Sequence, residues 1–254
     1  WCLMKKKFFY ALAIGCLLGS LFVLSACSSS DNKKHTNDSS DQSEKKVSVG
    51  IYEHLKKAKN EIWYVVDKPT KDGVPSQIYV FNDGKVKGYS QSSLADGKTL
   101  GELSRMKDKE IIDYFESQEG TELKTLYERA LGNASQFPET SQYKTMADAL
   151  ETYGDGKGKL PKVSFTAKLE TDGTGKEIES ENINIDILRV KQESDDGNFL
   201  NYTARLKHVT STSEIYNSVY NGFETKTASF PFFITRSKDQ YLLDTSGTKG
   251  IEVD

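Results

Sequence analysis

The sequence predicts an α+β fold that consists of an N-terminal β-meander, central helices and a C-terminal antiparallel sheet. Runs of β-branched and aromatic residues fill residues 61–91, and such runs return after residue 162. Between them, over residues 99–153, apolar residues recur every three or four positions, which is typical of amphipathic helices. Strands and helices therefore follow one another in blocks, whereas a βαβ protein alternates them along the chain.

The N-terminal meander is predicted from three β-rich runs that are separated by turn residues. Residues 62–66 (IWYVV) and 78–81 (IYVF) are dense in β-branched and aromatic side chains, and residues 86–89 resume the pattern after Asp83-Gly84. Asp-Gly between two such runs is a strong signal for a hairpin. We therefore expect three antiparallel strands over residues 61–91.

Three apolar stripes predict three helices in the central region, the first from near Asp108 and the second from Thr121 as its N-cap. Residues four or three positions apart lie on one face of a helix, so each stripe is expected to face a hydrophobic core. In order, the stripes are Ile111, Ile112 and Phe115; Leu123, Leu126, Tyr127 and Ala130; and Tyr143, Met146, Ala147 and Leu150.

Five β-rich runs predict the C-terminal sheet. They cover residues 163–169, 178–190, 200–209, 229–235 and 241–244. Glycine-containing segments between them suit antiparallel neighbours, and Asn221-Gly222 predicts one further turn. The glycine-rich segment that precedes the first of these runs marks a possible subdivision of the domain near residues 154–162.

Residues 1–26 have the layout of a bacterial export signal. A basic head, Lys5 to Lys7, precedes an apolar run from Phe8 to Val23, and Leu24-Ser25-Ala26-Cys27 follows. This tetrapeptide resembles the lipobox of bacterial lipoproteins, so we expect cleavage before Cys27. Residues 1–3 are expected to precede the natural start at Met4. An uncleaved anchor helix is the alternative, since the apolar run approaches the roughly 20 residues that span a bilayer.

The resemblance to a lipobox implies that diacylglycerol is attached to the thiol of Cys27. Lipid on Cys27 would anchor the chain to the cell membrane, facing its extracytoplasmic side. Several acyl chains on one residue hold a protein on a bilayer, because each buried methylene contributes about 0.8 kcal/mol. Residues 28–46 contain no apolar residue, so residues 27–46 are expected to form a disordered tether. Residues 47–254 are expected to form a soluble α+β domain.

The positions of the cysteines and the net charge bear on how the domain is stabilised and on which partners it binds. All three cysteines (Cys2, Cys16 and Cys27) lie in or beside the export signal, so the domain is predicted to fold without a disulfide. The chain carries a formal charge of -3, and loss of the three lysines of the basic head leaves 31 basic against 37 acidic residues, or -6. This mild acidity argues against nucleic acid as a partner, because nucleic-acid binding requires a basic face.

No metal site, cofactor or catalytic residue is predicted. Beyond the tether the histidines are His54 and His208, which do not form a closely spaced pair of metal ligands, and the domain has no cysteine. Ser-x-x-Lys sequences begin at Ser43, Ser104 and Ser141, but they lack the companion motifs of penicillin-recognising enzymes. Nothing in the sequence indicates an oligomeric state.

Aromatic residues are concentrated near the C-terminus, where asparagine and glycine lie between them. Together they could line a groove for a glycan or peptide ligand. The alternative interpretation is a core that large side chains fill. The candidate ligand-binding residues are Tyr216, Tyr220, Phe223, Phe230 and Phe232.

The chain also resembles uncharacterised lipobox-containing surface lipoproteins of lactic-acid bacteria and related Gram-positive bacteria. Apart from the signal, the resemblance covers mainly residues 160–254. It implies a location at the cell surface and supplies no catalytic residues. The residues that carry it are the lipobox, the turn at Thr171–Gly175, the segment from Ile215 to Phe223, Thr235-Arg236 and Leu243-Asp244.

The sequence favours a non-catalytic lipoprotein that binds a ligand or an envelope partner. Two alternatives remain open from the sequence. One is a solute-binding lipoprotein of a transporter, which usually has two α/β lobes. The other is an envelope hydrolase that acts on glycan or peptide.

Overall fold

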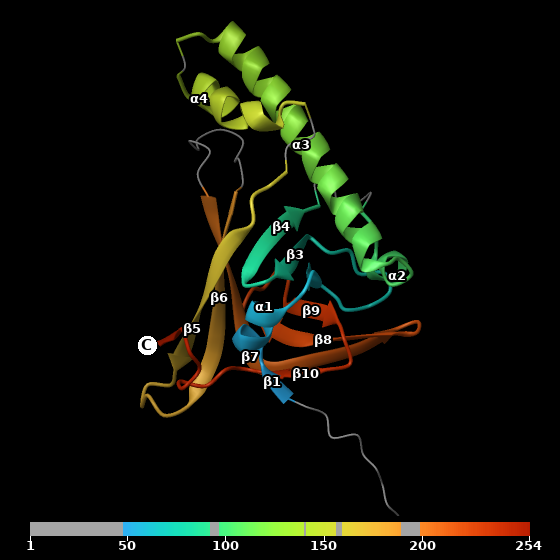
Figure 1. The fold of residues 1–254 in the computed structure, drawn as a ribbon, viewed down its shortest axis with the longest axis vertical. Helices are drawn as coiled ribbons and strands as arrows, with labels where there is room; N and C mark the ends of the chain where they lie inside the picture. Colours follow the sequence, from blue (N-terminus) through green and yellow to red (C-terminus); the bar gives the residue numbers. More distant parts are fainter. Residues whose placement is uncertain (1–47, 92–96, 140, 156–158, 189–198) are drawn as a thin grey trace, which may run out of the picture. The chain divides into compact units, whose positions relative to one another are not determined.

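The computed structural model describes residues 48–91, 97–139, 141–155, 159–188 and 199–254, and the fold is α+β, as the sequence predicts (Figure 1). The predicted export signal, Cys27 and the predicted tether lie outside the described residues. Within the described part of the chain, no helix combines the length and the apolar character that crossing a bilayer requires.

The predicted N-terminal meander is confirmed. It consists of β2 (Glu61–Val66), β3 (Gln77–Asn82) and β4 (Lys85–Ser90), each antiparallel to the next. Asp83 and Gly84 join β3 to β4, and both have positive φ angles, 54° and 71°. Two consecutive residues of positive φ are the requirement of a type I′ hairpin, which explains why Asp-Gly marks the turn.

The central region is helical, but the two helices expected on either side of Thr121 are one helix. The helices are α2 (Leu100–Leu103), α3 (Asp108–Gln136) and α4 (Ser141–Leu150), followed by a short 3-10 turn, η1 (Glu151–Tyr153). The Thr121 hydroxyl donates to the Ser117 carbonyl one turn earlier instead of capping a new helix. The apolar face continues past it, with Phe115, Glu119 and Leu123 all buried.

The C-terminal region forms β5 (Val163–Thr171), β6 (Ile178–Leu188), β7 (Phe199–Ile215), β8 (Ser218–Thr225) and β9 (Phe232–Arg236). Two of these strands, β5 and β7, are longer than predicted, β6 and β9 are shorter, and β8 is a strand that the sequence did not indicate. The expected turn at Asn221-Gly222 is wrong, because both residues lie inside β8. The turn lies instead at Tyr216-Asn217, where Tyr216 has a φ of 54°.

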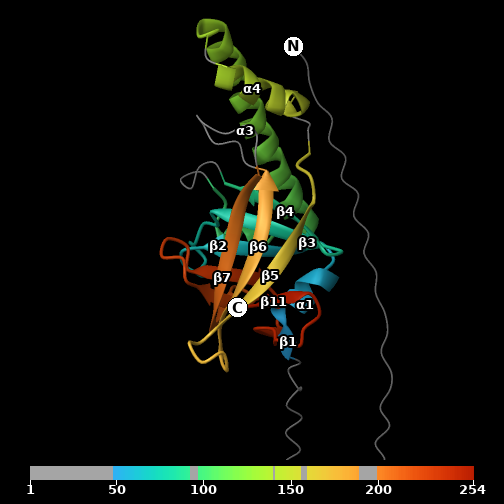
Figure 2. The same ribbon diagram turned by 90° about the vertical axis from the view of Figure 1, so that its left-hand side faces the viewer.

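The meander and the C-terminal strands form one sheet that closes on itself. Each strand from β2 to β9 is antiparallel to the next, and β9 pairs with β2. Figure 2 shows β5, β6 and β7 side by side, with β2, β3 and β4 behind them. Since β5 follows the predicted boundary near residues 154–162 and pairs with β4, both sides of that boundary contribute to the same sheet.

Short elements at the two ends of the domain lie close to each other. β1 (Ser48–Gly50) pairs in parallel with β10 (Gln240–Leu242), and α1 (Ile51–Lys57) follows β1 directly. β11 (Ile251–Val253) adds to the sheet as a parallel neighbour of β5. The sequence did not predict β1, α1 or β11, because elements of three to seven residues carry too little periodicity.

The inner face of the closed sheet is filled by large side chains. Trp63 and Phe233 stack with their ring centroids 4.7 Å apart, and Phe81 meets Phe165 edge to face at 5.0 Å. The buried residues of α1 complete this inner core, whose members include Ile51, Tyr52, Leu55, Trp63, Tyr79, Phe81, Phe165, Ile183, Phe223 and Phe233.

The outer face of β2, β3, β8 and β9 carries a second core beneath the helices. Ile62, Tyr64 and Val66 of β2 point to this side, as period-two alternation requires. Glu116 of α3 accepts hydrogen bonds from Lys87 at 3.0 Å and from the Tyr89 hydroxyl at 2.9 Å, which fixes α3 on β4. The stripes predicted for the helices therefore face a core; its helical members include Ile111, Phe115, Leu123, Leu126, Ala130, Met146, Ala147 and Leu150.

Gly222 provides a test of the pairing between β8 and β9. A Cβ atom at this position would lie 2.2 Å from the Phe233 carbonyl oxygen and 2.7 Å from the Ile234 Cα. Because both atoms belong to the backbone, Gly222→Ala is expected to lower the free energy of unfolding by about 2–3 kcal/mol. Urea denaturation measures it.

Gly173→Ala is the matched control, since its Cβ position has no heavy atom of any other described residue within 4 Å apart from those of its two chain neighbours. We expect this variant to unfold like the wild type. Equal stability of the two glycine variants would contradict the strand assignment of residues 218–225.

Candidate functional site

The five aromatic residues predicted to bind a ligand do not line one groove. Tyr220 and Phe223 are buried, with exposed fractions of 0 % and 1 %, and they belong to the outer and the inner core respectively. Phe230 packs against the inner core and Phe232 against the outer one. Tyr216 is half exposed in the β7–β8 turn. These residues are distributed over both faces of the sheet, as core residues are.

A candidate binding site lies at the surface of the domain, beside the start of α1. The residue before the helix is Gly50, which offers no side chain to cap it. Asp244 supplies the cap from the other end of the domain, because its Oδ2 accepts the Tyr52 backbone N–H at 2.6 Å. A Cβ atom at Gly50 would lie 2.6 Å from the Asp244 Oδ1, so glycine is what lets the carboxylate approach.

The segment after Asp244 forms a tight loop that faces α1. The Thr248 N–H donates to the Thr245 carbonyl at 2.9 Å, and Gly250 has a φ of 86° that favours glycine. The Thr248 side chain also hydrogen-bonds to Asp244. Asp244 therefore holds both α1 and this loop.

Between α1 and the loop lies a cleft of about 650 Å³, which we call the lysine cleft. Its volume falls within the range of about 300–1,000 Å³ that is typical of small-molecule sites. A second pocket, beside β10, has only about 110 Å³. The lysine cleft is lined by Glu53, Lys56, Lys57, Thr245, Gly247, Thr248 and Lys249.

The side chains of the lysine cleft are arranged for binding an anion. Lys57 pairs with Glu53 at 2.5 Å, whereas the Lys56 ammonium lies 5.0 Å from the centre of the Tyr52 ring. Three lysines against one glutamate give the lining a formal charge of +2. The hydroxyl of Thr245 adds a neutral donor at the same surface, while the Thr248 hydroxyl is bonded to Asp244.

Beneath the lysine cleft two carboxyl groups are buried side by side. Glu181 of β6 is 0 % exposed and Asp244 is 3 % exposed. The Glu181 Oε2 accepts the Asp244 backbone N–H at 2.8 Å, while its Oε1 has no partner within hydrogen-bond distance among the described residues. Glu181 thus joins the inner face of β6 to the residue that holds the cleft.

Burial determines the protonation of this pair. It raises the pKa of Glu181 to about 8, and the Asp244 carboxylate acts in the same direction, while the hydrogen bond from the Asp244 N–H opposes both. Burial also raises the pKa of Asp244, against the N–H groups of Tyr52 and Glu53. Glu181 is therefore mainly a neutral acid at pH 7. Since neither side chain is accessible, the pair supports the cleft and does not contact a ligand.

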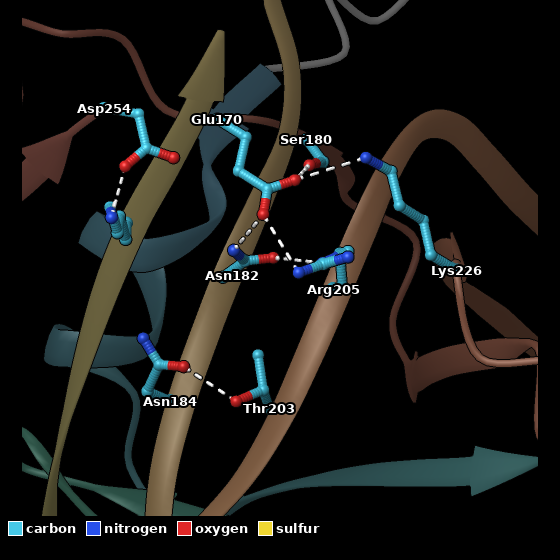
Figure 3. Close-up of polar contacts among 9 residues, drawn as sticks. Glu170, Ser180, Asn182, Asn184, Thr203, Arg205, Lys226 and Asp254 are labelled. Atoms are coloured by element: carbon cyan, nitrogen blue, oxygen red, sulfur yellow. Dashed lines mark hydrogen bonds and ion pairs between the residues drawn. The ribbon is translucent and has the colours of Figure 1, made fainter.

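A second charged cluster lies on the outer face of β5, β6 and β7 (Figure 3). Glu170 of β5 accepts the Ser180 hydroxyl at 2.6 Å and the Asn182 amide at 2.9 Å. Arg205 and Lys226 form ion pairs with the same carboxylate at 3.1 and 3.2 Å. This cluster, the Glu170 cluster, connects three strands and the segment that follows β8.

The Glu170 cluster has the properties of a contact that stabilises the fold. Hydrogen bonds from Ser180 and Asn182 lower the pKa of Glu170 to about 2, and Lys226 and Arg205 act in the same direction against desolvation. The carboxylate thus stays ionised at neutral pH and does not exchange protons there. Both of its oxygens are already occupied, so we assign it to stability.

The structure gives the surroundings of His54 and His208 and bears on whether a metal ion could be held. His54 contacts Glu61 at 2.7 Å, and His208 is exposed on β7. Among the described residues, no group of three or more His, Cys, Asp and Glu is arranged to hold a metal ion.

The residues of the lysine cleft are not predicted from the sequence. Lys56-Lys57 and the TSGTKG segment at 245–250 are separated by nearly the whole domain, so no local pattern joins them. The turn-forming residues of that segment predict a loop, but they do not indicate that the loop forms part of a binding site.

Comparisons with protein-family models, with curated proteins and with solved structures found no match to this chain. The geometry of the described residues is therefore the basis for a functional proposal.

Glu181 makes a specific pH dependence of stability testable. The folded protein keeps the Glu181 proton up to a pH of about 8, whereas the ordinary pKa is 4.5. Because the folded state holds this proton more tightly than the unfolded state, proton binding by Glu181 stabilises the fold. The stabilisation is complete below pH 4.5 and is lost as the pH rises toward 8. Glu181→Gln, a neutral isostere, should abolish it. We expect the Tm of the variant relative to the wild type to rise between pH 5 and pH 8.

Glu179→Gln is the control for this measurement, because Glu179 is exposed on the same strand. Its Tm should follow that of the wild type across the range. A Tm difference between Glu181→Gln and the wild type that stays constant with pH would disprove the assignment of a raised pKa.

The Glu170 cluster predicts the opposite pH dependence. Glu170→Ala removes an acceptor that serves four donors and should lower the free energy of unfolding at pH 7 by about 1–2 kcal/mol. Because the pKa of Glu170 is lowered, this contribution is present above pH 4.5 and is lost as the pH falls toward 2. Urea unfolding at pH 7 and pH 2.5 tests this.

The control is Glu252→Ala, which removes an exposed carboxylate of β11. It should change stability by less than about 0.5 kcal/mol. If the effect of Glu170→Ala were as large at pH 2.5 as at pH 7, the role of the ionised carboxylate would be refuted.

Proposed function

We propose that the chain is a lipid-anchored extracytoplasmic lipoprotein whose domain binds a ligand, without catalysis, in the lysine cleft. The cleft is the observation that carries the proposal, because it combines about 650 Å³ of space with charged and hydroxyl groups at its surface. The sequence features that support the anchor are the export signal and the lipobox ending at Cys27.

The groups that face the cleft suit binding better than catalysis. Glu53 is the carboxylate of the lining, and it is paired with Lys57. General acid–base catalysis needs a group of suitable pKa within hydrogen-bond reach of the substrate. Glu181 has such a pKa, but it is buried below the cleft.

The sheet bears on the transporter alternative. A solute-binding protein of the usual kind has two lobes with parallel strands, and its ligand lies between them. Strands β2 to β9 form a single sheet in which neighbours are antiparallel. The arrangement of the described strands therefore gives no support to that alternative.

The anchor is tested by lipid labelling in cells. Cys27→Ala should abolish incorporation of a labelled fatty acid and leave the signal uncut, because the acceptor thiol is missing. Cys16→Ala, which changes a cysteine inside the apolar run, is the matched control and should be labelled like the wild type. Labelling that survives Cys27→Ala would exclude the lipobox.

The ligand site is tested by filling the cleft. Gly247 lines the cleft. Apart from its chain neighbours, the described residues place one heavy atom within 4 Å of its Cβ position, the Thr245 hydroxyl oxygen at 3.9 Å, so Gly247→Trp can occupy the space without strain. Isothermal titration of the detergent-solubilised full-length protein with wall glycans, peptides and anionic polymers should find a ligand whose affinity falls at least tenfold in this variant.

Gly173→Trp places the same side chain in open space at the β5–β6 turn and should bind like the wild type. Equal binding by Gly247→Trp and the wild type would move the site away from the cleft. No binding in any ligand class would overturn the proposed function.

A further inference from the structure

The lysine cleft is a positively charged surface on an acidic protein. Its lining has a formal charge of +2, although the whole chain has a charge of -3. Among the described residues, no carboxylate lies within ion-pair distance of Lys56 or Lys249, whereas Lys57 is paired with Glu53. Two of the three ammonium groups are thus available to a ligand.

From this arrangement we propose that the lysine cleft binds phosphate, as a phosphomonoester or phosphodiester group of a larger molecule. The inference rests on the proposed function and names the chemical class of its ligand. The juxtaposition that carries it is that of Lys56 on α1 with Lys249 on the facing loop, beside the hydroxyl of Thr245.

The kinds of donor favour phosphate over carboxylate. Lysine is an established phosphate binder that acts as a point charge, and a phosphate group offers two ammonium groups more acceptor oxygens and, as a monoester, more negative charge than a single carboxylate does. The residues that line the cleft include three lysines and no arginine. Two available ammonium groups match a phosphomonoester dianion or two successive phosphodiester anions.

The size of the cleft indicates that the phosphate belongs to a larger molecule. An inorganic phosphate ion would fill a small part of about 650 Å³. Two sources carry the same chemistry at a membrane surface, namely the headgroup of an anionic phospholipid and a phosphodiester polymer of the envelope. Both sources lie at the membrane surface, where the proposed lipid anchor would hold the domain.

The walls of the cleft are held in place before a ligand arrives. Asp244 accepts the Tyr52 N–H at the start of α1 and also bonds to Thr248 in the loop, while Glu181 holds the Asp244 backbone. A ligand therefore meets two lysines on elements that share one support. Such preorganisation reduces the entropy lost on binding.

The test compares two double variants of equal charge in the detergent-solubilised full-length protein. Lys56→Gln/Lys249→Gln removes the two available ammonium groups of the cleft. Lys85→Gln/Lys176→Gln removes two exposed lysines elsewhere and is the control. The probes are poly(glycerol phosphate) and glycerophosphoglycerol, the water-soluble headgroup of phosphatidylglycerol, and binding of both is measured by isothermal titration.

We expect the wild type and the control to bind at least one phosphate probe at low salt. The cleft variant should bind it at least tenfold more weakly, with an unchanged Tm. Binding of the polymer alone would identify a phosphodiester polymer as the source, and binding of glycerophosphoglycerol alone would identify a lipid headgroup. Equal loss in both double variants would show nonspecific charge attraction and overturn the inference.

The phosphate inference and the proposed function can fail separately. If no phosphate probe binds, but a neutral glycan or peptide binds and Gly247→Trp abolishes its binding, the inference is wrong and the binding function stands. If phosphate probes bind equally to the wild type and the cleft variant, the inference is wrong as well. If no ligand of any class binds, both the phosphate inference and the proposed binding function are wrong.

Discussion

The pairing of β9 with β2 is the constraint on which the rest of the structure depends. It joins segments about 170 residues apart, and the Thr235 hydroxyl reinforces it by donating to the Ile62 carbonyl at 2.7 Å. An open sheet would leave backbone N–H and C=O groups of both strands without partners. Closure pairs them and brings Trp63 against Phe233, so the aromatic interior forms where the two halves of the chain meet.

Closure also decides where a ligand can bind. The inner face is occupied by large side chains, and the outer face of β2, β3, β8 and β9 is covered by helices. The lysine cleft lies at neither face, because it is formed by α1 and the loop after Asp244. Glu181, an inward residue of β6, accepts the Asp244 N–H at the start of that loop, and β11 at its end pairs with β5, so both ends of the loop are coupled to the sheet.

Two glutamates on paired strands show how strongly the face of a strand determines chemistry. Glu170 pairs in register with Ser180, one residue before Glu181, and the two carboxyls point to opposite faces. The outward Glu170 meets four donors and has a pKa of about 2, whereas the inward Glu181 is desolvated and has a pKa of about 8. A shift of one residue along the strand thus separates a permanent anion from a neutral acid.

The sequence by itself determined the local elements whose signals are short-range. Asp83-Gly84 specified a turn because positive φ is intrinsic to that pair, and the stripes through Phe115 and Leu126 specified helical faces because periodicity is local. The export signal and Cys27 are likewise patterns of neighbouring residues, and their prediction stands untested by the described part of the chain.

Only the tertiary structure decided the rest. Asn221-Gly222 has the composition of a turn, yet it lies within β8, where β9 passes so close that a Cβ atom on Gly222 would lie 2.2 Å from the Phe233 carbonyl oxygen. Tyr220 and Phe223 are core residues on opposite faces, which depends on the strand that the sequence did not reveal. The lysine cleft unites Lys56 with Lys249, and its support comes from Glu181. Such contacts join residues that are distant in sequence, so closure of the sheet, and no local pattern, brings them together.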